Sequence, residues 1–217
     1  MIVTAIVAGA LGYVGYQVAK FSLDINNPTG LAKRDIHKHE KELETLVTEL
    51  VPLTDKEVEL LSLSHESKKS KTTRYNQHAG FLKSIYHEKL VAFSFKVYNK
   101  KDVSTLLVQT SEEKFFYISM KGETRVYFND KPFGLIRNDG TLLSSDGRTI
   151  YGQIQPQDVL LLHPISIKGK EVAAVINPKH TDSPNPRAYE YVEYTSENQR
   201  IIVLCLSLFT ILEESFV

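Results

Sequence analysis

Hydrophobic and polar positions follow three different patterns along the chain. Residues 2–19 are uncharged and mostly apolar, and Lys20 follows them directly. Residues 33–50 carry apolar side chains at helical spacing among charged ones, whereas the chain from Tyr75 onward shows short runs of β-forming residues broken by turn residues. We therefore expect three regions: a transmembrane anchor at residues 1–22, a loop with amphipathic helices at residues 23–74, and an antiparallel β domain at residues 75–217.

The first of these regions predicts a membrane-spanning helix. An α-helix rises about 1.5 Å per residue, so about 20 apolar residues cross a hydrocarbon core of about 30 Å. Residues 2–19 reach the short end of that range. Thr4, Ala8 and Gly12 fall at i, i+4 and i+8, a stripe of small residues typical of closely packed transmembrane helices. These three residues are the predicted packing face of the anchor.

Basic residues near the anchor lie only on its C-terminal side. They are Lys20, Lys33, Arg34, Lys38 and Lys41. The positive-inside bias therefore predicts a single-pass membrane protein with the bulk of the chain in the cytoplasm and the lipid bilayer as a partner. The single cysteine agrees with this location, because it cannot form an intrachain disulfide.

The same segment offers an alternative of a different class. Gly9, Gly12 and Gly15 form a GxxGxxG sequence close to the fingerprint of NAD(P)-dependent reductases. That fingerprint needs a second buried strand after its helix, and residues 21–30 are rich in turn formers instead. The reductase interpretation is therefore disfavoured.

A second feature also imitates that enzyme class. Tyr117 and Lys121 have the Tyr-x-x-x-Lys spacing of the reductase catalytic pair, and Ser104 precedes them. The chemistry needs both side chains on one helix face. Residues 115–120 are aromatic and β-branched and end at Lys121-Gly122, which predicts a strand and a turn.

Composition narrows the functional classes further. The chain has 217 residues, a formal net charge of zero and no HExxH, CxxC or Walker sequence. The neutral charge argues against nucleic acid as the main partner. His37 and His39 are two residues apart on a predicted helix, so they point to different faces and do not share a metal. We predict no catalytic residue, no metal and no cofactor.

Residues 33–50 predict an amphipathic helix. Its apolar stripe contains Leu43 and Leu46, and we expect it to pack on the domain that follows. The alternative is a homodimer or scaffold through a short coiled coil that ends at Leu53, with His39 breaking the heptad. Thr54-x-x-Glu57 is a capping box that predicts a second short helix up to Leu61.

The densest basic run of the chain follows this helix. We expect an exposed loop there, and the functional alternative is a site for anionic lipid at a cytoplasmic membrane surface. Each basic residue near such a surface contributes about 1 kcal/mol. The candidate lipid-binding residues are Lys68, Lys69, Lys71 and Arg74.

The β region predicts an antiparallel barrel or sandwich, because many short strands follow one another closely. Turn sequences such as Asn129-Asp130 and Lys168-Gly169 are typical of hairpins. The expected strands are residues 91–97, 104–110, 114–120, 124–129, 133–137, 149–154, 160–163, 165–167, 171–176 and 188–194.

The chain closes with an apolar segment at residues 201–212, which follows a capping box at Ser196-x-x-Gln199. Twelve residues are too few to span a bilayer, so we expect a buried helix inside a closed sheet, with a strand as the alternative. Cys205 lies in this segment, and a buried thiol there would have a raised pKa and be inert. His163 is expected to have a structural role.

A run of hairpins such as Asp146-Gly147-Arg148-Thr149-Ile150-Tyr151-Gly152-Gln153-Ile154, followed by the hydrophobic terminal helix, resembles the tubby-like superfamily. That group includes tubby C-terminal domains, the plant LURP-one proteins and phospholipid scramblases. The resemblance covers about residues 75–212 and implies a β-barrel threaded by a C-terminal helix, with membrane-proximal work such as lipid binding and no catalytic centre in the tubby branch. It carries over no binding residue. The anchor also departs from the scramblases, whose membrane segment is C-terminal.

The expected protein is therefore a membrane-anchored, non-enzymatic α+β chain, mainly β. It would bind lipid or a protein partner at the cytoplasmic membrane face.

Overall fold

The computed structural model describes residues 28–216 except 74, 99–101, 156–160, 182 and 184. The chain divides into two compact units, Met1–Lys38 and His39–Val217, and the second contains every described strand. The predicted anchor, with Thr4, Ala8 and Gly12, lies outside the described residues. Among the residues that the structure describes, no helix combines the length and apolar character needed to span a bilayer.

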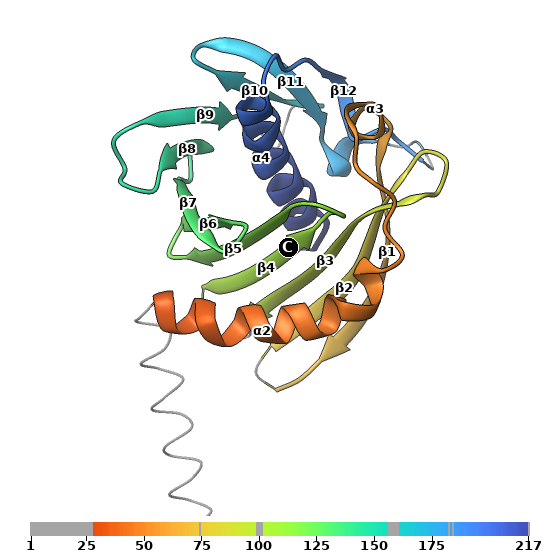
Figure 1. Ribbon diagram of the computed structural model, residues 1–217, viewed down its shortest axis with the longest axis vertical. Helices are drawn as coiled ribbons and strands as arrows, with labels where there is room; N and C mark the ends of the chain where they lie inside the picture. Colours follow the sequence, from red (N-terminus) through yellow and green to blue (C-terminus); the bar gives the residue numbers. More distant parts are fainter. Residues whose placement is uncertain are drawn as a thin grey trace, which may run out of the picture. The chain divides into compact units, whose positions relative to one another are not determined.

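Twelve antiparallel strands form one sheet in which each strand pairs with its neighbours in the sequence (Figure 1). The sheet nearly closes on itself, because Ser62 bridges Arg187 and the Ala188 amide donates to the Leu61 carbonyl at 2.7 Å. The strands are β1 Leu61–Lys71, β2 Tyr75–Ser84, β3 Lys89–Tyr98, β4 Val103–Gln109, β5 Lys114–Met120, β6 Glu123–Phe128, β7 Lys131–Ile136, β8 Thr141–Ser144, β9 Ile150–Ile154, β10 Leu162–Ile167, β11 Lys170–Ile176 and β12 Tyr189–Val192.

Tight turns of the predicted kind join these strands. Asn129 and Asp130 both have positive φ, as do Lys168 and Gly169. Positive φ at both central residues is typical of type I′ turns, whose twist matches that of the flanking strands. The predicted hairpins at these positions are confirmed.

The interior of the barrel is filled by helix α4, Glu197–Phe216, which Figure 1 shows running through the ring of strands. Every residue from Ile202 to Leu212 is buried. The Tyr117 hydroxyl donates to the Cys205 carbonyl at 2.9 Å, and the hydroxyls of Tyr189 and Ser207 lie 2.5 Å apart. The predicted antiparallel barrel with a buried C-terminal helix is therefore confirmed, and the strand alternative for residues 201–212 is wrong.

Two further helices precede the sheet. Helix α2 is Pro28–Val47, so the loop expected around residues 26–30 gives way to helix from Pro28 onward. Proline suits the first turn of a helix, where its missing amide costs nothing. Helix α3, Asp55–Glu59, confirms the second helix, although the Thr54 side chain makes no capping hydrogen bond. A short 3-10 helix, η1, covers Pro178–His180.

Several strand assignments differ from the prediction. Strands β2 and β8 were not predicted. The basic run expected as a loop belongs to β1, and β1 also begins at Leu61, where helix was expected. The expected strands at 160–163 and 165–167 are one strand, β10, which contains Pro164. Proline is tolerated there because β10 pairs with β9 only at Ile165 and Ser166.

Candidate functional site

Cross-strand pairing aligns two rows of inward-facing residues at the end of the barrel where α4 finishes. Neighbouring strands place paired residues on the same face of a sheet. The outermost row, here called the end row, is Lys71, Asn76, Val97, Ser104, Ser119 and Thr124 on strands β1 to β6. The next row is Lys69, His78, Phe95, Leu106, Tyr117 and Val126.

Two of the predicted lipid-binding lysines share this inner face of β1. Lys69 pairs with His78 and Lys71 with Asn76. Both lysines are exposed, and neither forms an ion pair with a described residue. The inner face of β1 therefore presents two unneutralised ammonium groups at the mouth of the barrel.

The third lysine of the run points the other way. Lys68 pairs with Ala79, and Ala79 pairs with Ser94, which contacts His39 on the outer side of the barrel. Successive side chains of a strand alternate between faces, so Lys68 cannot join Lys69 and Lys71. Arg74 lies outside the described residues. The structure thus brings together two of the four candidate residues.

A glycine allows β1 to lie where it does. A Cβ on Gly80 of β2 would come 1.8 Å from the carbonyl oxygen of Glu66 in β1, which is impossible for any other residue without a backbone shift. Glycine is the residue that permits such a close backbone approach. Gly80 therefore sets the path of the strand that carries Lys69 and Lys71.

A cluster of three rings, those of His65, His78 and Phe216, lies beside these lysines on the inner face of the sheet. The His78 and Phe216 rings have centroids 4.4 Å apart, and the His65 and Phe216 rings lie 4.9 Å apart in an edge-on arrangement. Burial, followed by the charges of Lys69 and His65, lowers the pKa of His78. His78 is therefore mostly neutral near pH 7, and the positive charge of this face comes mainly from the lysines.

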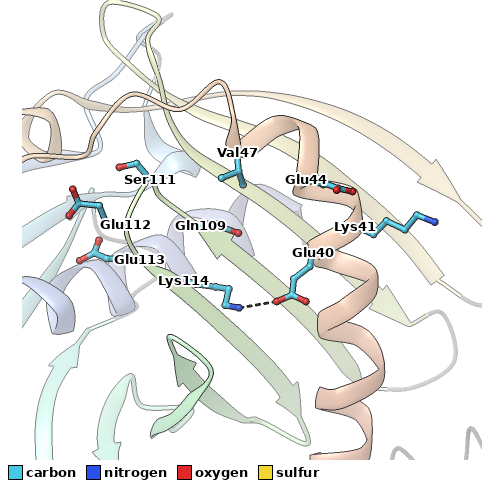
Figure 2. Close-up of a pocket in the computed structure, with 9 residues that line it drawn as sticks. All are labelled: Glu40, Lys41, Glu44, Val47, Gln109, Ser111, Glu112, Glu113 and Lys114. Atoms are coloured by element: carbon cyan, nitrogen blue, oxygen red, sulfur yellow. Dashed lines mark hydrogen bonds and ion pairs between the residues drawn. The ribbon is translucent and has the colours of Figure 1, made fainter.

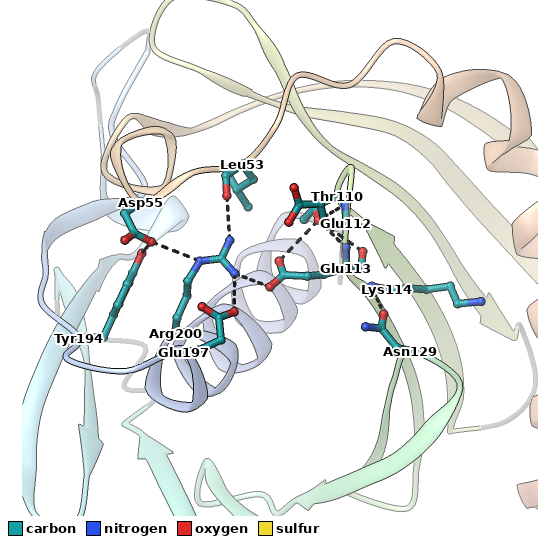
Figure 3. Close-up of polar contacts among 10 residues, drawn as sticks. All are labelled: Leu53, Asp55, Thr110, Glu112, Glu113, Lys114, Asn129, Tyr194, Glu197 and Arg200. Atoms are coloured by element: carbon teal, nitrogen blue, oxygen red, sulfur yellow. Dashed lines mark hydrogen bonds and ion pairs between the residues drawn. The ribbon is translucent and has the colours of Figure 1, made fainter.

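The opposite end of the barrel, where α4 begins, is closed by a charged network (Figure 3). Arg200 reaches Glu113, Glu197 at 3.2 Å and Asp55 at 3.4 Å, and it also donates to the Leu53 carbonyl at 2.8 Å. Burial raises the pKa of Glu113, while the Arg200 guanidinium acts against that rise. This network has every charge paired, and it fixes α4 to α3 and to the β4–β5 turn.

A charged groove lies on the outside of the barrel between α2 and the β4–β5 hairpin (Figure 2). It encloses about 510 Å³ and is lined by carboxylates of Glu40, Glu44, Glu112 and Glu113. The Lys114 ammonium bridges Glu40 at 2.8 Å and Asp130 at 2.7 Å. The groove therefore offers mixed charges that are already partly paired, which makes it a weak candidate for a ligand site.

The outer face of β3 and β4 is covered by the second half of α2. His39 Nδ1 lies 2.7 Å from Ser94 Oγ and Nε2 lies 2.9 Å from Thr105 Oγ1, while Gln77 donates to the same Ser94 oxygen at 3.1 Å. Leu43, one turn further on, is fully buried. The heptad break at His39 is thus part of a polar contact with the sheet, and the stripe expected to pack on the domain does so at these residues.

The remaining titratable groups of the core have structural contacts. His163 is buried between the Gln155 carbonyl at 3.2 Å and the Glu214 carboxylate at 3.2 Å, in line with its expected role. Burial raises the pKa of the Cys205 thiol to about 12, so it is protonated and unreactive as predicted.

The residues that imitate a reductase do not share a helix face. Tyr117 lies in strand β5 and is fully buried, and Lys121 lies in the following turn with positive φ. The expected strand and turn are confirmed. The GxxGxxG sequence itself falls outside the described residues.

No known family model matches the chain, and no curated protein or solved structure is significantly similar to it. The site must therefore be interpreted from its own geometry. The sequence pattern identified the lysines but missed His78 and Asn76, because β2 shows no clean alternation. The end row is visible only once the register of six strands is known.

Proposed function

We propose that the protein is a membrane-anchored, non-enzymatic barrel that binds anionic lipid headgroups through the inner face of β1. The observation that carries this proposal is the pair of unneutralised ammonium groups of Lys69 and Lys71 on one face. A phosphate group satisfies such a pair through charge-assisted hydrogen bonds. The proposed anchor is residues 1–22, which would hold the barrel on the cytoplasmic side of a single-pass membrane protein.

Further support comes from the architecture. A ring of antiparallel strands around a C-terminal helix is what a resemblance to the tubby-like superfamily implies, and that group works close to membranes. Fold likeness alone does not specify function. The proposal of lipid binding therefore depends on Lys69 and Lys71, and the resemblance to the tubby-like superfamily is consistent with it.

Full-length protein in detergent micelles provides the test. Short-chain phosphatidylglycerol and phosphatidylcholine are titrated in calorimetry at low salt. We expect the anionic lipid to bind more tightly, and the double variant Lys69→Glu/Lys71→Glu to weaken that binding at least about tenfold, since each basic residue contributes about 1 kcal/mol.

The matched pair is Lys69→Glu and Lys68→Glu, because each reverses one charge and the two side chains lie on opposite faces of the same strand. Lys68→Glu should retain most of the affinity for phosphatidylglycerol, whereas Lys69→Glu should lose part of it. Equal losses from these two single variants would show that net charge alone attracts the lipid, and the proposed face would then be wrong.

Three alternatives give different outcomes in the same preparation. A dimerising scaffold through residues 33–50 would appear as a two-chain mass in light scattering that Leu46→Glu abolishes. The disfavoured reductase would bind NADPH at micromolar strength and lose it on Gly12→Val. A protein partner in place of lipid would leave both lipid titrations without heat.

A further inference from the structure

A cavity of about 270 Å³ opens at the same end of the barrel, beside the end row. Its walls come from the ends of β3 to β6 and from the last turns of α4, which contributes Phe209 and Glu213. Three of its lining residues, Ser104, Ser119 and Thr124, are adjacent members of the end row and carry hydroxyl groups. The cavity thus combines two carboxylates, those of Asp102 and Glu213, with one aromatic ring and a row of hydroxyls.

The Glu213 carboxylate has no hydrogen bond or ion pair with any described residue. Burial and the neighbouring Glu214 carboxylate raise the pKa of Glu213, against the opposing effect of Lys179. Removing a carboxylate from water costs free energy unless a partner compensates it. Glu113, at the other end of the barrel, has such a partner in Arg200. Glu213 has none among the described residues, so its carboxylate is available to a bound cation.

The hydroxyls supply acceptors around this carboxylate. Ser119 and Thr124 share one hydrogen bond of 2.8 Å, which leaves lone pairs on both oxygens. Ser104 makes no side-chain hydrogen bond within the described part of the chain. Asn76 Oδ1, nearby in the end row, is another acceptor that is buried without a hydrogen-bond partner.

Apolar groups form another part of the lining. The Phe209 ring stacks on Tyr117 with centroids 5.2 Å apart, which fixes its orientation, and Val97 and Met120 flank the opening. The face of an aromatic ring attracts cations. The cavity therefore offers a negative charge, several acceptors and a short apolar wall.

We infer that this cavity binds a primary ammonium group carried by a small polar molecule, with Glu213 as its counter-charge and Ser104 as an acceptor. An ammonium group has three donors and no acceptor, which fits a cavity lined by carboxylates and hydroxyls. A quaternary ammonium has no donor and would leave the hydroxyls unpaired. A hard divalent cation is disfavoured, because such ions take several charged oxygens and no group of three metal-ligating side chains exists among the described residues.

A free amine and the ethanolamine headgroup of a lipid present the same ammonium. The inference does not rest on lipid binding at β1. One ligand could nevertheless occupy both sites, because they are close together. In the end row, only Asn76 separates Val97 at the cavity from Lys71. A lipid that joins a phosphate to a primary ammonium would match both.

The test uses the full chain in detergent micelles and calorimetric titration with ethanolamine, choline and the short-chain phosphatidylethanolamine and phosphatidylcholine. We expect ethanolamine or phosphatidylethanolamine to bind in a saturable way, at least about tenfold more tightly than its choline counterpart. Binding by ethanolamine itself identifies a free amine as a sufficient ligand, and binding by the lipid alone identifies the headgroup. Equal affinity for the choline compounds, or no binding by either amine, overturns the inference.

Variants locate the site and separate it from the lysine face. Glu213→Gln should weaken amine binding at least about tenfold, and Ser104→Ala should weaken it by a smaller factor. Glu59→Gln removes an exposed carboxylate of α3 and should change nothing. Unchanged binding by Glu213→Gln contradicts the inference. Lys69→Glu/Lys71→Glu should leave ethanolamine binding intact, so a failure of the lysine proposal is distinguishable from a failure here.

Discussion

At the end of the barrel where α4 begins, Arg200 contacts three carboxylates, and Glu113 is buried beside it. At the end where α4 finishes, Lys69, Lys71 and Glu213 have no ion-pair partner among the described residues. Both ends carry charge of both signs on similar strand ends. The first end has its charges arranged to hold elements together, and the second leaves them accessible to a ligand.

The difference shows how a barrel of this kind separates stability from binding. Charges that are buried and paired are costly to break, because one partner is then left unsatisfied. Charges that are unpaired contribute little to stability and are free to meet a ligand. Substitutions at the two ends should therefore affect different measurements.

The largest effect is expected at the closed end. Arg200→Ala leaves Glu113 buried without its guanidinium, which should lower the free energy of unfolding by about 3 kcal/mol. Urea unfolding of the full chain in detergent measures the loss. The double variant Arg200→Ala/Glu113→Gln also removes the unpaired Glu113 carboxylate, so it should recover part of the lost free energy of unfolding. A loss below about 1 kcal/mol in Arg200→Ala alone would contradict the contrast between the two ends.

A smaller effect is expected between the two ends, where the sheet contacts α4. Tyr117→Phe removes the hydroxyl that donates to the Cys205 carbonyl and should lower the free energy of unfolding by about 1 kcal/mol. Thermal unfolding provides the measurement. Lipid and amine titrations should be unchanged, and an altered affinity would mean that the core, too, determines binding.

At the open end we expect a pH-dependent effect. A carboxyl group with a raised folded-state pKa contributes stability below its unfolded pKa and loses that contribution as the pH rises through the folded value. Glu213→Gln should therefore gain stability relative to the natural chain between about pH 4 and pH 7, by less than about 1 kcal/mol. Urea unfolding at both pH values tests this, with Glu59→Gln as control; a loss of stability would indicate a partner for Glu213.

The smallest effect is expected outside the barrel. Glu40→Gln removes one of two carboxylates that contact Lys114, and the pair is partly exposed. Exposed ion pairs contribute little, so the free energy of unfolding should change by less than about 0.5 kcal/mol. A loss as large as that of Arg200→Ala in the same urea experiment would show that burial does not explain the contrast.

Much of the fold could be predicted from local patterns. Hairpin residues such as Lys168-Gly169 fix their own backbone conformation, and the all-round apolar character of residues 201–212 requires a surrounding sheet. Strand β1 was missed because its outer half is exposed on both faces and carries no alternation. Strands β2 and β8 were missed as well.

The candidate site was only partly predictable. Charge density identified Lys68, Lys69 and Lys71 together, but only the register with β2 separates Lys68 from the other two. No sequence pattern pointed to Glu213, because its role depends on the absence of a nearby ion-pair partner in the folded chain. Such information is tertiary and cannot be obtained from spacing along the chain.

Helix α4 follows all twelve strands in the sequence, although it fills the space that they enclose. The strands are therefore synthesised before the helix against which their inner faces pack. The ring can reach its final packing only after residues 197–216 have been synthesised. Interference with that final helix should thus appear as aggregation of newly made chains rather than as loss of binding by finished ones.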